Sequence, residues 1–386
     1  MLYTAPNGTQ YLIVIGLDQS VLIYKRAVNS STWGTGFDLG TIAGNPLDIP
    51  TVDPDVVGLQ EASHFIFSLA VDANGFIHIV GNMHNTFPRR YVRSTNPHDI
   101  TAWTDGNAFI DDSALAFDFY TYNRFTALSD GTLLWVFHGT FGGVIGVSAR
   151  RALFRLNPGD TDWEPFASDG LFMTCNTTAG DSDPDRAYHS VLYTDLNDTV
   201  HFVGLWQMLS GDDETRGNVF YVRSTDRGVT WKTVNGTAIT PPFTLAMTTS
   251  TSACQVYADP ATVTNGFDVD ENGPHISVGA ETNGLRFSWS GSAWTSVVES
   301  PLIGGHTIIN HRYGGMWRIR SASGTFRIQS DDTSQRVDFG HETGGGWTPV
   351  LDPTLQQRGI AAFAYPRDDD SPRVYTFGGG YRTSAI

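Results

Sequence analysis

Residues 218–231 read NVFYVRSTDRGVTW, and the last eight of them fit the pattern S-x-D-x-G-x-T-W. In this pattern, Asp226 and Gly228 make a tight turn, and Trp231 is expected to pack between strands. β-Rich runs separated by turn residues precede the motif. The stretch from Ala187 to Thr240 therefore predicts one four-stranded antiparallel unit, in which the motif has a structural role.

Similar units follow one another along the chain at roughly 40 to 50 residues, which is typical of β-propeller blades. The expected units are Tyr11 to Leu39, His64 to Trp103, Tyr122 to Trp163, Ala187 to Thr240, Asn265 to Trp294, His306 to Trp347 and Gly359 to about Tyr381. We expect an all-β fold, a seven-bladed β-propeller of four-stranded antiparallel blades, as a single domain over residues 1–386. The N-terminal strand would complete the last blade, and residues 170–185 and 209–217 would form long loops.

The composition agrees with this fold class. The 386 residues include 41 glycines and 12 % aromatic side chains, which favours strands and turns, and we expect no helix longer than about two turns. The formal charge of −16 argues against a nucleic-acid partner, whose binding protein would be basic. A polyanionic substrate would need a local basic patch, for which the candidates are Arg89, Arg90, Arg93, Arg124, Arg150 and Arg151.

The chain contains no apolar run long enough for a membrane span and no visible signal peptide. We expect an extracellular or secreted monomer whose signal peptide is not in this chain, with association with a virion as the alternative. Cys175 and Cys254 fit either buried thiols or one bridge.

Residues 61–93 read EASHFIFSLAVDANGFIHIVGNMHNTFPRRYVR, in which two histidines bracket a predicted hairpin. His64 and His84 lie 84 − 64 = 20 residues apart, with the turn near the middle. Both rings can therefore face the same end of the sheet. His78 and His201, each in a strand behind a turn, are interpreted as packing residues.

Several segments together resemble the BNR-repeat polysaccharide lyases typified by ulvan lyases. They are Tyr221-Val-Arg-Ser224 with the turn after it, Asn265 to His275, the hairpin followed by Tyr91-Val-Arg-Ser94, and Thr121-Tyr-Asn-Arg-Phe125. The resemblance covers roughly residues 10 to 380. It implies a seven-bladed propeller that cleaves an acidic polysaccharide by β-elimination.

The resemblance also implies the catalytic residues. His64 and His84 match the family's histidine pair, and Tyr122 matches its tyrosine. The family usually has arginine 138 − 122 = 16 residues later, where this chain has His138. Histidine is only partly protonated at neutral pH, whereas arginine is always charged, so this departure puts permanent charge neutralisation at position 138 in question.

β-Elimination at a uronic acid explains the need for these residue types. The C5 proton is weakly acidic until the neighbouring carboxylate is neutralised, and the O4 leaving group needs a proton. We expect Tyr122 as general base and acid, one of His64 and His84 as partner, and the other with His138 as neutraliser. The family resemblance points to sulfated rhamnose-uronate polymers as substrate.

Further residues are candidates for substrate binding. They are Asn85, Arg89, Arg124, Tyr188 and His189. No cofactor is expected. Histidines and a cysteine near predicted inner strands have no recognised zinc spacing, so we assign no metal and leave a structural zinc or calcium ion open.

Two other functions fit parts of the sequence. A sialidase or related glycoside hydrolase is also a propeller with such turns, but we find no early Arg-Ile-Pro type motif, and the histidine pair would be unexplained. A non-catalytic glycan-binding propeller, such as a phage-tail receptor-binding or depolymerase module, fits the acidic composition. Catalysis that depends on Tyr122 would distinguish a lyase from a binding module.

Overall fold

The computed structural model describes most of the chain. The described residues are 2–15, 20–44, 47, 67–81, 83, 89–110, 119–140, 150–167, 170–174, 186–195, 197–210, 213–259, 261–270, 273–280, 284–298, 316–321, 324–331, 336–343, 346–349, 359–364 and 373–378. In these residues the fold is all-β, and each sheet is antiparallel.

The N-terminal half contains three sheets. The first has β1 (Leu2–Thr4), β2 (Gln10–Ile15), β3 (Val21–Arg26) and β4 (Phe37–Asp38). The second has β5 (Ser68–Val71), β6 (Ile77–Val80), β7 (Tyr91–Ser94) and β8 (Trp103–Asp105). The third has β9 (Phe119–Ala127), β10 (Leu133–Thr140), β11 (Arg150–Leu156) and β12 (Glu164–Pro165), and β13 (Leu171–Met173) also pairs with β11. Two 3-10 turns, η1 (Leu39–Thr41) and η2 (Gly106–Phe109), follow outer strands.

The remaining sheets repeat the same order. The fourth has β14 (Arg186–Thr194), β15 (Val200–Ser210), β16 (Asp213–Ser224), β17 (Trp231–Lys232) and β18 (Ala238–Ile239), with β19 (Gln255–Tyr257) also paired to β16. The fifth has β20 (Ala261–Asp270), β21 (Gly273–Ala280), β22 (Gly284–Trp289) and β23 (Trp294–Val298). The sixth has β24 (Met316–Ser321), β25 (Gly324–Asp331), β26 (Arg336–Thr343) and β27 (Gly346–Pro349), and the last has β28 (Gly359–Ala364) and β29 (Arg373–Gly378).

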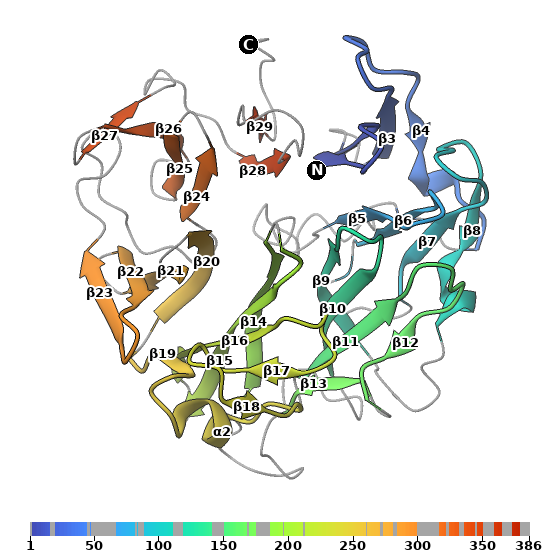
Figure 1. Ribbon diagram of the computed structural model, residues 1–386. Helices are drawn as coiled ribbons and strands as arrows, with labels where there is room; N and C mark the ends of the chain where they lie inside the picture. Colours follow the sequence, from blue (N-terminus) through green and yellow to red (C-terminus); the bar gives the residue numbers. More distant parts are fainter. Residues whose placement is uncertain are drawn as a thin grey trace.

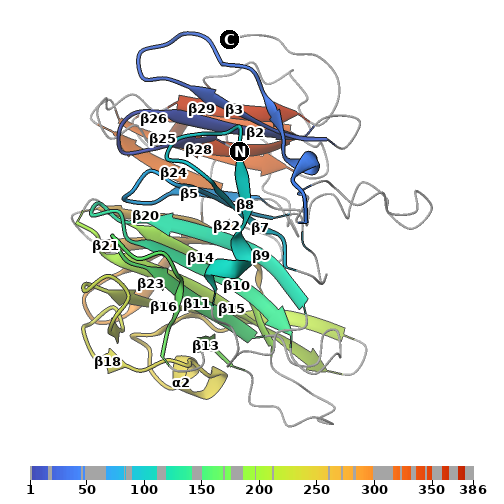
Figure 2. The same ribbon diagram turned by 90° about the vertical axis from the view of Figure 1, so that its right-hand side faces the viewer.

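The sheets follow one another clockwise in Figure 1, from the N-terminal sheet at the upper right to β28 beside the N-terminus. The short helix α2 (Leu245–Thr249) lies at the opposite end of the molecule from the N-terminal sheet in both Figure 1 and Figure 2. Several four-stranded sheets therefore match the predicted repeats. In the described residues the last sheet has two strands, so a count of seven complete blades stays a prediction.

The hydrophobic core lies between neighbouring sheets. In β10, Leu134 and Val136 belong to a cluster shared with the fourth sheet, whereas Trp135 and Phe137 belong to a cluster shared with the second sheet. Successive side chains of a strand point to opposite faces, so the apolar run Leu133–Phe137 covers both faces of its sheet. The third sheet is thus held by its two neighbours.

A buried hydrogen-bond network closes the turn of the second sheet. Oδ1 of Asp72 accepts the turn amides, and its Oδ2 accepts from Nε2 of His78 at 3.2 Å. Since Nε2 donates, Nδ1 of His78 accepts from the Tyr91 hydroxyl at 2.6 Å. The Tyr91 oxygen accepts in turn from the indole N–H of Trp163, in the third sheet, at 2.9 Å.

The fourth sheet repeats this network. Asp195 accepts the turn amides and Nε2 of His201 (3.3 Å), whose Nδ1 lies 2.7 Å from the Tyr221 hydroxyl. Burial lowers the pKa of both His78 and His201, although the aspartates act in the opposite direction. These two histidines are therefore neutral structural groups, as the sequence indicated.

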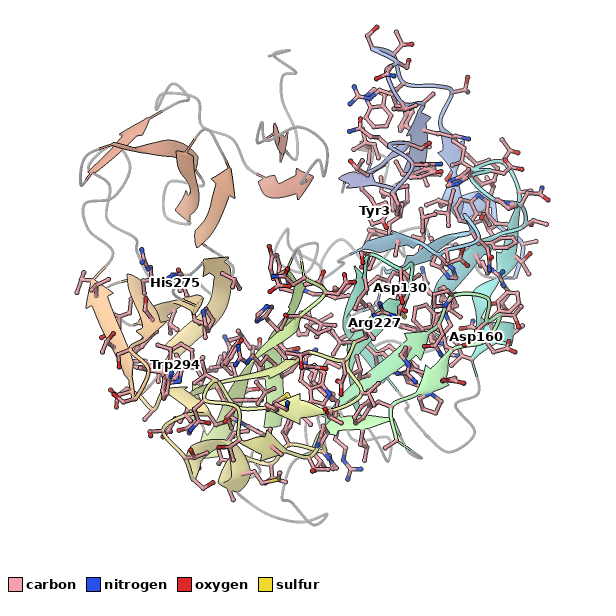
Figure 3. The ribbon with its side chains drawn as sticks, in the orientation of Figure 1. Tyr3, Asp130, Asp160, Arg227, His275 and Trp294 are labelled. Carbon is pink, nitrogen blue, oxygen red and sulfur yellow. The ribbon has the colours of Figure 1, made fainter. Side chains whose placement is uncertain are left out.

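The turn at Ser224–Trp231 joins the third and fourth sheets. The Asp226 carboxylate accepts from the Thr230 amide at 2.8 Å, and the Trp231 indole donates to the Gly228 carbonyl at 3.1 Å. Trp231 lies in the core cluster between the two sheets. Arg227 then forms an ion pair with Asp130 of the third sheet at 2.5 Å (Figure 3).

Three expectations differ from the structure. Residues 209–217 were expected as a loop, but β15 and β16 continue as one hairpin that pairs Ser210 with Asp213, because main-chain pairing tolerates its polar side chains. Part of the predicted 170–185 loop is strand β13. The N-terminal strand β1 pairs with β2 in the first sheet, so it does not complete the last one.

Cys254 is a buried free thiol, and burial raises its pKa to about 12. Of the two alternatives from the sequence, the buried thiol therefore holds for this residue. Cys175 lies outside the described residues. Across the described part of the chain, no helix is long and apolar enough to cross a membrane.

The neutral buried histidines predict acid sensitivity of the fold. Unfolded histidine has a pKa near 6.5, and the folded values are lower, so full stability holds above pH 6.5 and decreases as pH falls below it. Each histidine adds up to about 1.4 kcal/mol per pH unit to this slope. Urea unfolding between pH 7.5 and 5.5 should show a smaller slope for His201→Gln than for the wild type. Equal slopes would contradict the assignment.

Candidate active site

Tyr122 lies in a β-bulge on β9. The register between β9 and β10 shifts between Val136 and His138, so Tyr122 and Asn123 together oppose Phe137. Tyr122 has φ of 51°, a left-handed conformation that is unfavourable for a bulky residue. Asn123 is buried, and its Oδ1 accepts from the indole N–H of Trp135 at 3.1 Å, which holds the bulge in place. Strained residues of this kind cluster at functional sites.

The side chains of His138, Tyr188 and Arg151 lie close to the Tyr122 ring. It is stacked with the ring of His138 at a centroid distance of 6.0 Å and an interplanar angle of 1°. It meets the ring of Tyr188 edge to face, at 6.2 Å and 72°. The guanidinium carbon of Arg151 lies 5.7 Å from the centroid of the same ring.

Strand register explains why His138 and Arg151 meet Tyr122. His138 has the same parity as Leu134 and Val136, so it points towards the fourth sheet. Arg151 on β11 is paired directly with His138, and directly opposed residues share a face. Tyr188 comes from β14, the first strand of the fourth sheet, so the site lies where these two sheets meet.

Arg151 is buried to 1 % exposure, which is unusual for a charged side chain. Its Nε and Nη2 atoms have no hydrogen-bond partner among the described residues. Burial lowers the pKa of Arg151 to about 9, with Arg124 acting in the same direction and Tyr122 and Tyr188 opposing. The guanidinium therefore stays positively charged at neutral pH.

Two more arginines flank this group. The guanidinium of Arg216 on β16 lies 4.2 Å from the ring centroid of Tyr188. Arg124, two residues after the bulge on β9, has its pKa lowered by burial and influences Arg151 electrostatically. Tyr122, His138, Arg151, Tyr188, Arg124 and Arg216 are called the tyrosine–arginine cluster below. It is a locally basic region in a chain of net charge −16.

The other predicted site residues fall into two groups. Arg89 is buried, and its guanidinium donates to Asn107 (2.7 Å) and Tyr120 (3.4 Å), so it links the second and third sheets. The main chain of His189 lies on β14 beside Tyr188. The remaining candidates, His64, His84 and Asn85, lie outside the described residues.

Arg151 was not predicted as a site residue from the sequence. Arg150-Arg151 reads as a pair of arginines at the start of a strand, where solvated side chains are common. The only signal was its place among the basic residues considered for a polyanion. For the described part of the chain, no group of three His, Cys, Asp or Glu side chains is placed to hold a metal ion.

Comparisons with known proteins agree with the fold. A PL25 ulvan lyase, described as a new family of polysaccharide lyase, matches with a TM-score of 0.66 at 16 % identity, over 96 % of this chain and 90 % of that chain. A structure of a PL25 ulvan lyase bound to -[GlcA(1-4)Rha3S]- gives the same values. The polysaccharide lyase Uly1 matches with a TM-score of 0.61 at 14 % identity, over 98 % of this chain and 86 % of that chain.

The chain therefore shares its fold with these polysaccharide lyases. The BNR repeat-containing family matches residues 10–306, and the chain belongs to this family. The resemblance that the sequence indicated is thus confirmed. A search of curated protein sequences gives no match.

Two N–H groups of Arg151 find no acceptor within the described parts of the chain, and this predicts an unusual stability effect. A buried polar group without a partner costs about 1–3 kcal/mol, and apolar replacement of buried charges is often neutral or stabilising. Arg151→Met should therefore keep or raise the free energy of unfolding in urea. The matched control is Arg155→Met. Arg155 lies on β11 like Arg151, is partly exposed and pairs with Glu164, so its replacement should change the free energy of unfolding little. A loss of several kcal/mol in Arg151→Met would show that Arg151 is a structural ion-pair residue.

Proposed function

We propose that this protein is a polysaccharide lyase that cleaves an acidic, uronic-acid-containing polysaccharide by β-elimination. The observation that carries the proposal is Tyr122, held in a strained bulge with its ring close to both the imidazole of His138 and the guanidinium of Arg151. The fold shared with polysaccharide lyases supports it.

The reaction is balanced without a cofactor. Tyr122 Oη, as the phenolate, takes the C5 proton and becomes the phenol, and the electron pair of the C5–H bond forms the C4–C5 double bond as the C4–O4 bond breaks. The departing O4 takes a proton from the same phenol and becomes a hydroxyl group. The products are a 4,5-unsaturated uronate end and a new chain end.

Positive charge near the carboxylate makes the C5 proton removable. In this proposal His138 and one of His64 and His84 contribute to neutralisation, and the other histidine shares the proton transfer. Tyr188, His189, Asn85, Arg89 and Arg124 are the proposed substrate-binding residues. The cationic surroundings of Tyr122 suit this chemistry better than the hydrolysis of most glycoside hydrolases, which use a pair of carboxylates.

The broader setting belongs to the same proposal. A PL25 ulvan lyase of the same fold has been solved with -[GlcA(1-4)Rha3S]-, which supports a sulfated, ulvan-like substrate. We propose a seven-bladed, monomeric propeller that acts outside the cell, where such polymers occur.

The first test is a continuous ultraviolet assay on ulvan and other uronic-acid polysaccharides. Elimination creates a double bond conjugated to the carboxylate, which absorbs in the near ultraviolet, whereas hydrolysis does not. The wild type should give a rising signal. Tyr122→Phe keeps the ring contacts but lacks the phenol, so it should fold normally by circular dichroism and lose at least about 100-fold in kcat.

Absence of a signal with every substrate would contradict the proposal. A reducing-sugar assay on the same samples would then separate a hydrolase from a glycan-binding protein. Full activity of Tyr122→Phe would remove Tyr122 from its role while leaving the lyase reaction.

His138→Arg tests the position where the resemblance expects arginine. If this position helps to neutralise the carboxylate, permanent charge there should retain or raise kcat/KM in the same assay, with the largest gain above pH 7, where histidine is neutral. Loss of activity with an intact circular dichroism spectrum would count against that role.

A further inference from the structure

We infer that Arg151, rather than His138, provides the permanent charge that binds the substrate carboxylate. This inference rests on the proposed function and assigns one of its tasks to a residue on a different strand, β11. It makes Arg151 a catalytic residue in direct contact with substrate.

Arg151 lies close to both His138 and Tyr122. Arg151 is the direct cross-strand partner of His138, and its guanidinium lies 5.7 Å from the centroid of the Tyr122 ring. A carboxylate bound to this guanidinium therefore lies next to Tyr122, which is where C5 of a uronate must be for proton removal. Compared with the arginine expected at position 138, the positive charge of Arg151 lies on the neighbouring strand and on the same face of the sheet.

Two nitrogen atoms of the Arg151 guanidinium lack a hydrogen-bond partner among the described residues. Nε and Nη2 form one edge of the guanidinium fork, and both are buried without a hydrogen-bond partner among the described residues. This edge carries two parallel N–H groups, which match the two oxygens of a carboxylate. A buried polar edge without a partner calls for a bound ligand or ion that satisfies it, and in this inference that ligand is the substrate carboxylate.

The positive charges around Arg151 also favour an anionic ligand at this place. Arg124 is close enough to Arg151 to lower its pKa, so two cations lie near each other beside Tyr122 and Tyr188. An anionic ligand would relieve this repulsion and satisfy the open edge. The ring of His138, which lies parallel to the Tyr122 ring at 6.0 Å, then acts on the position of the phenol.

A carboxylate and a sulfate share the chemistry that this edge recognises, and Arg151 could also act by stabilising ionised Tyr122. Methyl esterification of the uronate separates these roles. The ester carries no charge and its C5 proton is already more acidic, so elimination no longer needs a neutralising cation. The sulfate groups and the need for Tyr122 remain.

The experiment compares initial ultraviolet rates on ulvan and on methyl-esterified ulvan for wild type, Arg151→Met, Arg151→Lys and Arg155→Met. Arg151→Met should lose about 100-fold in kcat on free-acid ulvan, which is the usual effect of removing one charge-stabilising group. On the ester it should stay within about threefold of the wild type, because the neutralised charge is absent. Arg155→Met should match the wild type on both.

Arg151→Lys keeps the charge without the fork, and it should show a smaller selective loss on the free acid. It decides the outcome if Arg151→Met fails to fold by circular dichroism. Equal losses on acid and ester in folded variants would overturn the inference in favour of sulfate binding or an effect through Tyr122. Unchanged rates on both substrates would also overturn it. No signal from the wild type on either substrate would instead contradict the proposed function.

Discussion

The site depends on the burial of both faces of the third sheet. In β10, alternate side chains of Leu133–Phe137 enter two different core clusters, so one strand holds three sheets together. A sheet with two apolar faces cannot be stable alone, and the repeats must stack in sequence. Polar groups are then accommodated at the strand ends, where this packing stops. His138 follows directly on the apolar run, and it is there that the candidate site begins.

The bulge on β9 converts this regular packing into a site. An uninterrupted register would place Tyr122 in simple alternation with its neighbours. The extra residue instead turns the ring onto His138, while Asn123 is held by Trp135 below it. A similar shift on β14 puts Tyr188 and His189 together opposite Leu205, so both tyrosines come from irregular first strands of adjacent sheets. The left-handed backbone conformation of Tyr122 destabilises the fold by about 1–3 kcal/mol, and the packing of the surrounding sheet offsets this strain.

Sequence patterns predicted the repeats well because turns and tryptophans recur at fixed places. The family resemblance, rather than a pattern, placed Tyr122 and His138 in one site, and their rings are stacked in the structure. Sequence patterns did not reveal Arg151, because its meaning depends on the register between β10 and β11 rather than on its neighbours in the chain. For the same reason the Asp72–His78–Tyr91 network was invisible, since it joins a turn to two strands. The 209–217 segment was missed because backbone pairing leaves no hydrophobic pattern.

The placement of Arg151 runs against the packing of its own strand. Its same-face neighbour Leu153 lies in the core between the third and fourth sheets, and an apolar residue at position 151 would continue that core. The chain instead has a buried cation beside a second cation, Arg124. Structural ion pairs satisfy such charges with a fixed acidic partner. Arg151 has an open N–H edge beside a strained tyrosine, so its charge is most simply explained by a ligand that arrives from outside and carries the complementary carboxylate.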